Sequence, residues 1–258
     1  MNSSHIVLLA AAGLAAGTAN SIAGGGSFIS FPSLLVTGML PVNANATSTV
    51  AIWPGVLAST GAYRKVIGRP LIKLVLPLMA VTLIGSLFGA WLLLHTPQLT
   101  FMKMVPWLLL AGNTLFVLGP KITVWANRGK AAAAPSRLRI CLVTIAQLVV
   151  AIYIGYYGAG VGFLLLPILA MMGIENMHAM NGLRVLLATV GNAVAVVLFI
   201  AARAVIWPQA LLVMVGAILG GYAGAHYAQK LKPATVRSIV ISIGVGMTVY
   251  FFWRTRGM

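Results

Sequence analysis

The sequence predicts an all-α integral membrane protein with about eight transmembrane helices, built from two repeats that each contain a glycine-broken or re-entrant half-helix. Three observations predict this fold class. Of the 258 residues, 60% are hydrophobic and 7% are charged, whereas an ordinary soluble domain carries about 25% charged residues. Long stretches lack charge entirely, the first from Met1 to Tyr63. A short glycine-rich motif also recurs in the two halves of the chain.

The apolar segments set the expected spans, because a spanning helix needs about 20 predominantly apolar residues. The predicted spans are 5–23, 46–63, 74–94, 104–120, 140–157, 185–202, 208–229 and 238–253. Two shorter apolar pieces remain, 27–39 and 162–173. At about 1.5 Å per residue they reach only part of the way across, so we expect re-entrant half-helices or the second halves of broken helices. Eight spans imply that the two repeats are parallel. Whether the repeats are parallel or inverted depends on whether these two pieces cross the membrane.

The basic residues orient these spans, because Lys and Arg collect in cytoplasmic loops. With eight spans, 12 of the 17 Lys and Arg residues fall on one side, including Arg203, Arg254 and Arg256. We therefore expect a multi-pass protein of the cell membrane with both termini in the cytoplasm. Residues 1–5 contain no Lys or Arg, so no cleaved signal peptide is expected.

The same pattern divides the chain. The expected units are a first transmembrane repeat at 1–120, a basic cytoplasmic linker at 121–139 and a second transmembrane repeat at 140–258.

The internal repeat appears when the chain is shifted by 135 residues against itself. The matched pairs are Gly25 with Gly160, Phe28 with Phe163, Pro32 with Pro167, Leu34 with Leu169, Gly38 with Gly173 and Ala44 with Ala179. A glycine cluster allows a helix to break and a backbone to approach a ligand closely. Glycine-interrupted short segments at corresponding positions of two halves indicate the binding site of a transporter.

Each copy is expected to form a half-helix that starts at an N-cap, Ser27 or Gly162, and ends at Gly38 or Gly173. The alternative for glycine is close helix packing, which is common in membrane proteins. We favour packing for isolated pairs such as Gly13 with Gly17 and Gly220 with Gly224. For the clusters at 24–26 and 158–162 the repeat favours a functional break.

A helix N-terminus carries unpaired N–H groups and a partial positive charge, so the two half-helix starts predict an anion site. Arg184 is the candidate fixed cation, with snorkelling to the membrane interface as its alternative. Neutral donors complete the site, although Asn45 and Thr47 are also expected to cap the span 46–63. The expected substrate-binding residues are Asn20, Gly24, Gly25, Gly26, Ser27, Asn45, Thr47, Ser48, Thr49, Tyr157, Gly158, Gly160, Gly162, Asn181 and Arg184.

The scarcity of acids excludes several classes of function. Glu175 is the only acidic residue, Cys141 is the only cysteine, and the four histidines have no metal-ligand spacing. Paired catalytic carboxylates, a Ser-His-Asp triad and carboxylate cages for metals therefore cannot form. We expect neither an enzyme nor a metal or cofactor protein. Nucleic acid is not an expected partner, because the basic residues of a membrane protein collect in its cytoplasmic loops and set the orientation of its spans.

The glycine motif carries a family resemblance. The run Gly24 to Ser27 leads through Phe28 to Pro32, and the run Asn45 to Ser48 follows a short polar turn. This pattern, with a degenerate copy from Tyr157 to Gly162, resembles the TauE/SafE sulfite exporter family of TSUP-type anion transporters. The resemblance covers the whole chain and is sharpest at residues 13–55. It implies export or permeation of sulfite and small organosulfur anions such as sulfonates through a duplicated helical bundle.

We therefore expect a transporter or exporter of small sulfur-containing anions, sulfite or an organosulfonate, with its site between the two repeats. Uniport or facilitated export is the expected mechanism, because the sequence offers no carboxylate pair for proton or sodium coupling. The alternatives are a transporter of another small oxyanion or carboxylate and a non-transporting membrane subunit. The expected partners are the small anion and the lipid bilayer, with a homo-oligomer left open.

Overall fold

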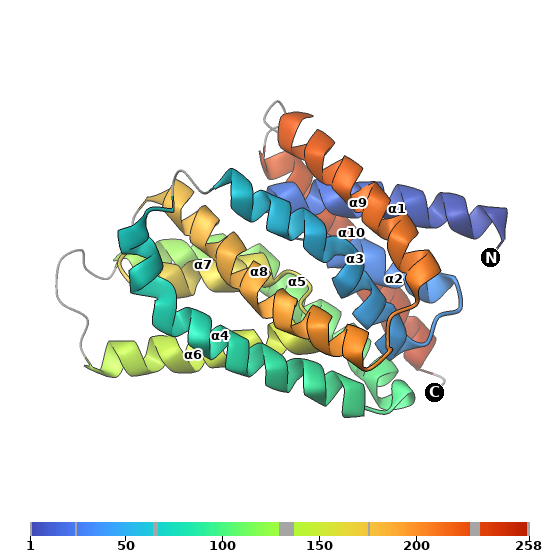
Figure 1. The fold of residues 1–258 in the computed structure, drawn as a ribbon, viewed down its shortest axis with the longest axis horizontal. Coiled ribbons are helices and arrows are strands. Elements are labelled where there is room, and N and C mark those ends of the chain that lie inside the picture. Colours follow the sequence, from blue (N-terminus) through green and yellow to red (C-terminus); the bar gives the residue numbers. More distant parts are fainter. Residues whose placement is uncertain are drawn as a thin grey trace.

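The computed structural model describes residues 2–23, 25–63, 67–128, 137–174, 176–227 and 233–256. Within these residues the chain forms ten α-helices and no strand (Figure 1), which confirms the all-α fold class. The helices are α1 (Ser3–Ala23), α2 (Ser27–Val36), α3 (Pro41–Ala62), α4 (Arg69–His95), α5 (Gln98–Arg128), α6 (Arg137–Tyr156), α7 (Val161–Met171), α8 (Met177–Ala201), α9 (Trp207–Tyr227) and α10 (Pro233–Thr255).

The two expected half-helices are present as α2 and α7, with 10 and 11 residues. At about 1.5 Å per residue each is roughly half as long as the hydrocarbon core is thick. Each helix contains the proline that the repeat aligns, Pro32 and Pro167. Each ends as expected, because Gly38 and Gly173 follow the last turn with φ of 85° and 80°, a left-handed conformation that suits glycine.

Two ends of the bundle can be named from their contacts. The terminal end holds both chain termini (Figure 1) and the turns at 37–40 and 202–206, where the Asn43 side-chain amide donates to the carbonyl of Ala204 (2.9 Å). At the opposite end, which we call the linker end, Ile67 from the connection between α3 and α4 lies against Gly182 near the start of α8. Helix α3 therefore begins where α8 ends, and the two helices run antiparallel.

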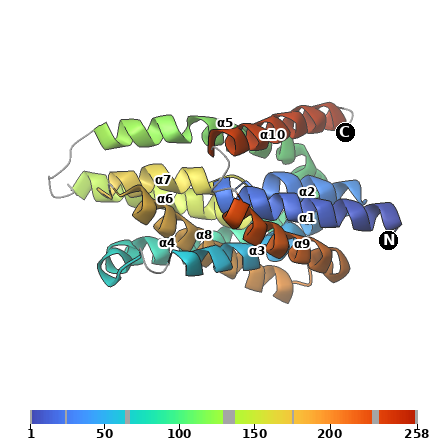
Figure 2. The ribbon, with the colours of Figure 1, turned by 90° about the horizontal axis from the view of Figure 1, so that it is seen from above.

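The helices form three layers. Figure 2 shows α5 and α10 along one side, α3, α4, α8 and α9 along the other, and α1, α2, α6 and α7 between them. The most extensive helix contacts are between α1 and α9 and between α4 and α6. The first helix of each half therefore packs on the fourth helix of the other half.

Small residues permit these close contacts. A Cβ atom added at Gly13 or Gly17 would meet the backbone of α9, and one added at Gly220 would meet the backbone of α1 at Leu14. The packing role predicted for these three glycines is confirmed. A Cβ atom added at Gly89 of α4 would meet the backbone of α6 at Ile152, and one added at Gly85 would meet the Ala151 side chain of α6, so both interfaces depend on glycine.

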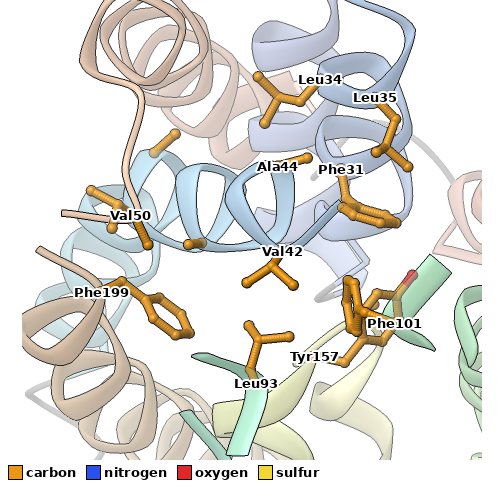
Figure 3. Close-up of a cluster of buried hydrophobic side chains, with 14 of the residues drawn as sticks. Phe31, Leu34, Leu35, Val42, Ala44, Val50, Leu93, Phe101, Tyr157 and Phe199 are labelled. Atoms are coloured by element: carbon orange, nitrogen blue, oxygen red, sulfur yellow. The ribbon is translucent and has the colours of Figure 1, made fainter. Parts of the chain in front are cut away.

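Two hydrophobic clusters form the core. One surrounds Phe31, Phe101 and Phe199 and extends from α1 to α10, and Figure 3 shows part of it. The other lies toward the linker end around Leu165 and Leu183. Tyr157 and Ala159 belong to the first cluster and Val161 to the second, so the start of α7 lies where the two clusters meet.

Four helices in the described part of the chain are long and apolar enough to cross a membrane: Arg69–His95, Gln98–Gly119, Arg137–Tyr156 and His178–Ala201. Their outward faces carry exposed large apolar side chains such as Ile84, Trp91 and Val149. Such a surface suits contact with lipid.

The connections differ from the expected topology. Helix α2 turns back along α1, because Gly26 lies against Ala16, so the pair returns to the terminal end. The expected grouping of Arg203, Arg254 and Arg256 with the linker is therefore wrong. Arg203 belongs to the turn at 202–206, and Arg254 and Arg256 lie in and directly after the last turn of α10, whose end lies at the terminal end (Figure 1), whereas Arg137 starts α6 directly after the linker. Helix α5 also continues to Arg128, so helical structure enters the expected linker. Residues 129–136 lie outside the described residues.

Candidate functional site

The candidate site is the break between α6 and α7. Helix α6 ends at Tyr156, and α7 begins at Val161. Gly158 and Gly160 both have φ of 72°, and this left-handed conformation disfavours residues that carry a Cβ atom. The N-cap of α7 is Gly160 rather than the expected Gly162, which lies inside the helix.

The start of α2 lies close to α1. An added Cβ atom at Gly26 would be 2.6 Å from the Ala16 carbonyl and 3.0 Å from Cβ of Asn20. Gly26 is the N-cap of α2, so the expected cap Ser27 is instead the first helical residue. The backbone N–H of Phe28 donates to the carbonyl of Gly25, and those of Ile29 and Ser30 donate to Gly26. Gly24 lies outside the described residues.

Phe28 joins the two half-helix starts. Its ring atoms would lie 3.0 Å from a Cβ atom added at Gly160 and 3.1 Å from one added at Gly112 of α5. The Phe28 side chain is fully buried. The two starts are therefore brought together as expected, but an aromatic ring fills the notch between them. Phe28 was not among the expected substrate-binding residues, although its alignment with Phe163 in the repeat was a signal for it.

Buried polar residues of α3 bond to the break, to α2 and within α3 itself. The Asn45 side-chain amide donates to the Tyr156 carbonyl, 3.1 Å away at the broken end of α6. The Ser48 and Ser30 hydroxyls lie 2.6 Å apart. The Thr49 hydroxyl donates to the Asn45 carbonyl one turn earlier. These groups are buried and already bonded.

Asn45 and Thr47 do not cap a helix, contrary to expectation. Helix α3 begins at Pro41, and a proline in the first helical position has no N–H that would need a partner. Thr47 lies inside the helix, where its hydroxyl accepts the backbone N–H of Ile206 (3.0 Å). It therefore fixes the turn between α8 and α9.

Tyr153 and Tyr157 lie at the break, and their hydroxyl groups differ in hydrogen bonding. The Tyr153 hydroxyl donates to the Ala159 carbonyl at 2.7 Å. The Tyr157 side chain is 2% exposed, and its hydroxyl has no hydrogen-bond partner among the described residues. Its ring packs edge-on against Phe31, with centroids 5.6 Å apart.

Asn181 and Arg184 lie apart from the break. Both belong to the linker-end part of α8, where Gly182 contacts Tyr63 and Ile67. The residue of α8 nearest to the break is Asn192, whose side-chain oxygen would lie 3.8 Å from a Cβ atom added at Gly158. Arg184 precedes it by eight residues, about 12 Å along a helix. Arg184 is buried and does not start its helix, which begins at Met177.

The structure also contains a pocket that sequence reasoning missed. A cavity of about 330 Å³ opens at the terminal end and is lined by Thr37, Gly38, Met39, Leu40, Asn43, Ile206 and Gln209. Gln98 shapes it, because its amide donates to Asn43 and accepts the backbone N–H of Val42. These contacts join segments that are far apart in the sequence.

The family model for the sulfite exporter TauE/SafE matches residues 9–251. The chain belongs to the TauE/SafE sulfite exporter family. Its relatives include the "Probable membrane transporter protein YfcA" of Escherichia coli, with 28% identity over 94% of this chain and 87% of that protein. A "Probable membrane transporter protein" of Haemophilus influenzae is 27% identical over 94% of this chain and 92% of the relative. The comparison with solved structures found no match.

The family and the names of these relatives support a multi-pass membrane transporter. In this family context, the break between α6 and α7 is irregular backbone inside a membrane protein. Such backbone is tolerated where it is enclosed by protein or lines a watery passage.

Proposed function

We propose that the chain exports small sulfur-containing anions, sulfite or an organosulfonate, through a site at the break between α6 and α7. The observation that carries this proposal is the junction itself, where the starts of α2 and α7 meet across Phe28. The N-terminus of α7 supplies backbone N–H groups and a partial positive charge. The proposed site takes Tyr157, Gly158, Gly160 and Gly162 from the break and the first turn of α7, and Asn20, Gly26 and Ser27 from the start of α2 and the adjoining end of α1.

The other expected site residues take different parts in the proposal. Asn45 holds the break and Thr47 the turn between α8 and α9 through their hydrogen bonds. Ser48 joins α3 to α2 at Ser30, and Thr49 bonds within α3. Asn181 and Arg184 lie on the route from the linker end. Phe28 closes the notch, so transport requires its ring to move away from Gly160.

The two halves act as inverted repeats in this proposal. The packing supports it, because α3 and α8 run antiparallel and each half packs its fourth helix on the first helix of the other. Helix pairs α1–α2 and α6–α7 would then enter the membrane from opposite sides. A site between inverted repeats near the middle of the membrane is typical of secondary transporters.

The charge distribution supports an orientation opposite to the one expected from the sequence. Among the Lys and Arg residues that the structure describes, Lys103, Arg203, Arg254 and Arg256 belong to the terminal end, and the other eight belong to the linker end. Because Lys and Arg collect in cytoplasmic loops, the proposal places the linker end in the cytoplasm and both termini outside it.

Uniport driven by the membrane potential is the proposed mechanism. With Glu175 as the only acid, the chain lacks the carboxylates that proton and sodium relays use. Moving one charge through 100 mV is worth about 2.3 kcal/mol. An inside-negative potential would therefore drive a monoanion out of the cell.

Flux into proteoliposomes tests this function. Purified protein is expected to carry sulfite and methanesulfonate saturably, and faster when a potential is imposed that is positive on the destination side. Empty liposomes are the control. Absence of flux for every sulfur anion would contradict the proposed function, whereas flux that required a sodium or pH gradient would contradict uniport alone.

A further inference from the structure

The aromatic cluster around Tyr157 carries an inference about which anions pass. We define this cluster as Phe31, Phe101, Tyr153, Tyr157 and Phe251. Ring centroids in it lie 5.6 to 6.4 Å apart, mostly with one edge toward the next face. Figure 3 shows Tyr157 beside Phe101, below Phe31 of α2. The cluster therefore links α2, α5, α6 and α10 next to the break.

The Tyr157 hydroxyl is a buried polar group without a hydrogen-bond partner in this aromatic cluster. The ring that carries it packs against the rings of Phe31, Phe101 and Tyr153, and no hydrogen-bond partner for the buried hydroxyl lies among the described residues. An unmade hydrogen bond of a buried polar group is unfavourable, and buried polar groups in proteins normally have partners. The neighbouring Tyr153 follows that rule, because its hydroxyl donates to the Ala159 carbonyl.

We propose that the Tyr157 hydroxyl donates a hydrogen bond to an oxygen of the transported anion, and that the cluster makes the protein select monoanions over dianions. This inference rests on the proposed function and narrows its substrate class to sulfonates and hydrogen sulfite. The edges of aromatic rings carry partial positive charge, so the cluster tolerates one diffuse negative charge.

The selection follows from desolvation. The cost of moving an ion out of water rises with the square of its charge, so a dianion costs roughly four times as much as a monoanion of the same size. Hydrogen bonds from neutral donors and contacts with ring edges offset only a part of this desolvation free energy. A sulfonate also carries an apolar group, which the rings of Phe31 and Phe101 can cover.

Two probes and one pair of variants test the inference. Methanesulfonate is a monoanion and sulfate a dianion of similar shape, and each is titrated against purified protein and followed into proteoliposomes. The wild type is expected to carry methanesulfonate at least about tenfold faster than sulfate. Tyr157→Phe removes only the hydroxyl and is expected to bind methanesulfonate about tenfold more weakly, as for one hydrogen bond to a charged group.

Tyr222→Phe is the matched comparison, because it makes the same change on α9, outside the cluster, where the side chain is 82% exposed. This variant is expected to keep the wild-type binding of methanesulfonate and the ratio of methanesulfonate to sulfate flux. Thermal unfolding of Tyr157→Phe shows whether it keeps the fold. Unchanged methanesulfonate binding in folded Tyr157→Phe, or equal wild-type flux of the two anions, would overturn the inference and leave the proposed function standing. A wild type that carried neither probe and no sulfite would overturn both.

Discussion

Single residues set the geometry of the break. Gly158 and Gly160 provide left-handed backbone, and Asn45 holds the free carbonyl at the end of α6. Phe28 then seats its ring on Gly160. Each residue has a distinct physical task, so substitutions can separate backbone strain from side-chain contact.

Gly160→Ala and Gly173→Ala form such a pair. Both positions have left-handed φ, 72° and 80°, so alanine is strained at each by about 1–2 kcal/mol. Only at Gly160 would the new Cβ atom meet another group, Phe28, whereas nothing lies within 4 Å at Gly173. We expect Gly160→Ala to lose more free energy of unfolding than Gly173→Ala, as measured by denaturation in detergent. Equal losses would show that the Phe28 contact is not tight.

The sequence predicted the ends of the half-helices but not the tasks of the polar residues. A helix that ends in left-handed backbone needs glycine at that position, which is a local requirement, so Gly38 and Gly173 could be recognised in the repeat. The partners of Asn45 and Thr47 lie 111 and 159 residues away, and no local pattern contains them. Phe28 was missed for the same reason, because the notch that it fills is formed by Gly112 and Gly160 of other helices.

At the level of helices, the pairs α1–α9 and α4–α6 hold the bundle together. Their axes approach closely because glycine faces the partner backbone, and side-chain hydrogen bonds such as that from Thr18 to the Gly220 carbonyl (3.0 Å) add to the contact. Helices in lipid associate through such packing, since the lipid is as apolar as the side chains.

Gly220→Ala tests this contact. A methyl group at Gly220 would collide with the backbone of α1 at Leu14, whereas at Gly246 of α10 nothing lies within 4 Å. We expect Gly220→Ala to cost about 1–3 kcal/mol by overpacking and Gly246→Ala to be neutral or to stabilise by up to about 1 kcal/mol through helix propensity. Thermal unfolding of the two variants measures the difference. A stable Gly220→Ala protein would contradict the close approach of α1 and α9.

At the level of the whole molecule, the topology is the part that the sequence could not settle. Hydropathy locates apolar segments but does not say whether a short segment returns to the side from which its predecessor came. The pairs α1–α2 and α6–α7 do return, because Gly26 packs back on α1 and the break at 157–160 redirects α7. One such return reverses the side on which every later loop falls.

Cysteine labelling decides the orientation. Gly68→Cys places a thiol at the linker end and Arg256→Cys places one at the terminal end, in a background with Cys141→Ser because Cys141 is exposed. Membrane-impermeant maleimide added to whole cells is expected to label Arg256→Cys and to leave Gly68→Cys unlabelled until the membrane is opened. The reverse pattern would restore the cytoplasmic termini expected from the sequence.

The packing of the first helix of each half on the fourth helix of the other half has a consequence for synthesis. The chain is made from the N-terminus, so α1 enters the membrane long before α9, on which it makes its most extensive contact. Its glycine face must wait, exposed to lipid or to an insertion partner, until nearly the whole chain has been translated. The first half therefore cannot make its most extensive helix contact on its own, and we expect assembly to be completed only after α9 has been inserted.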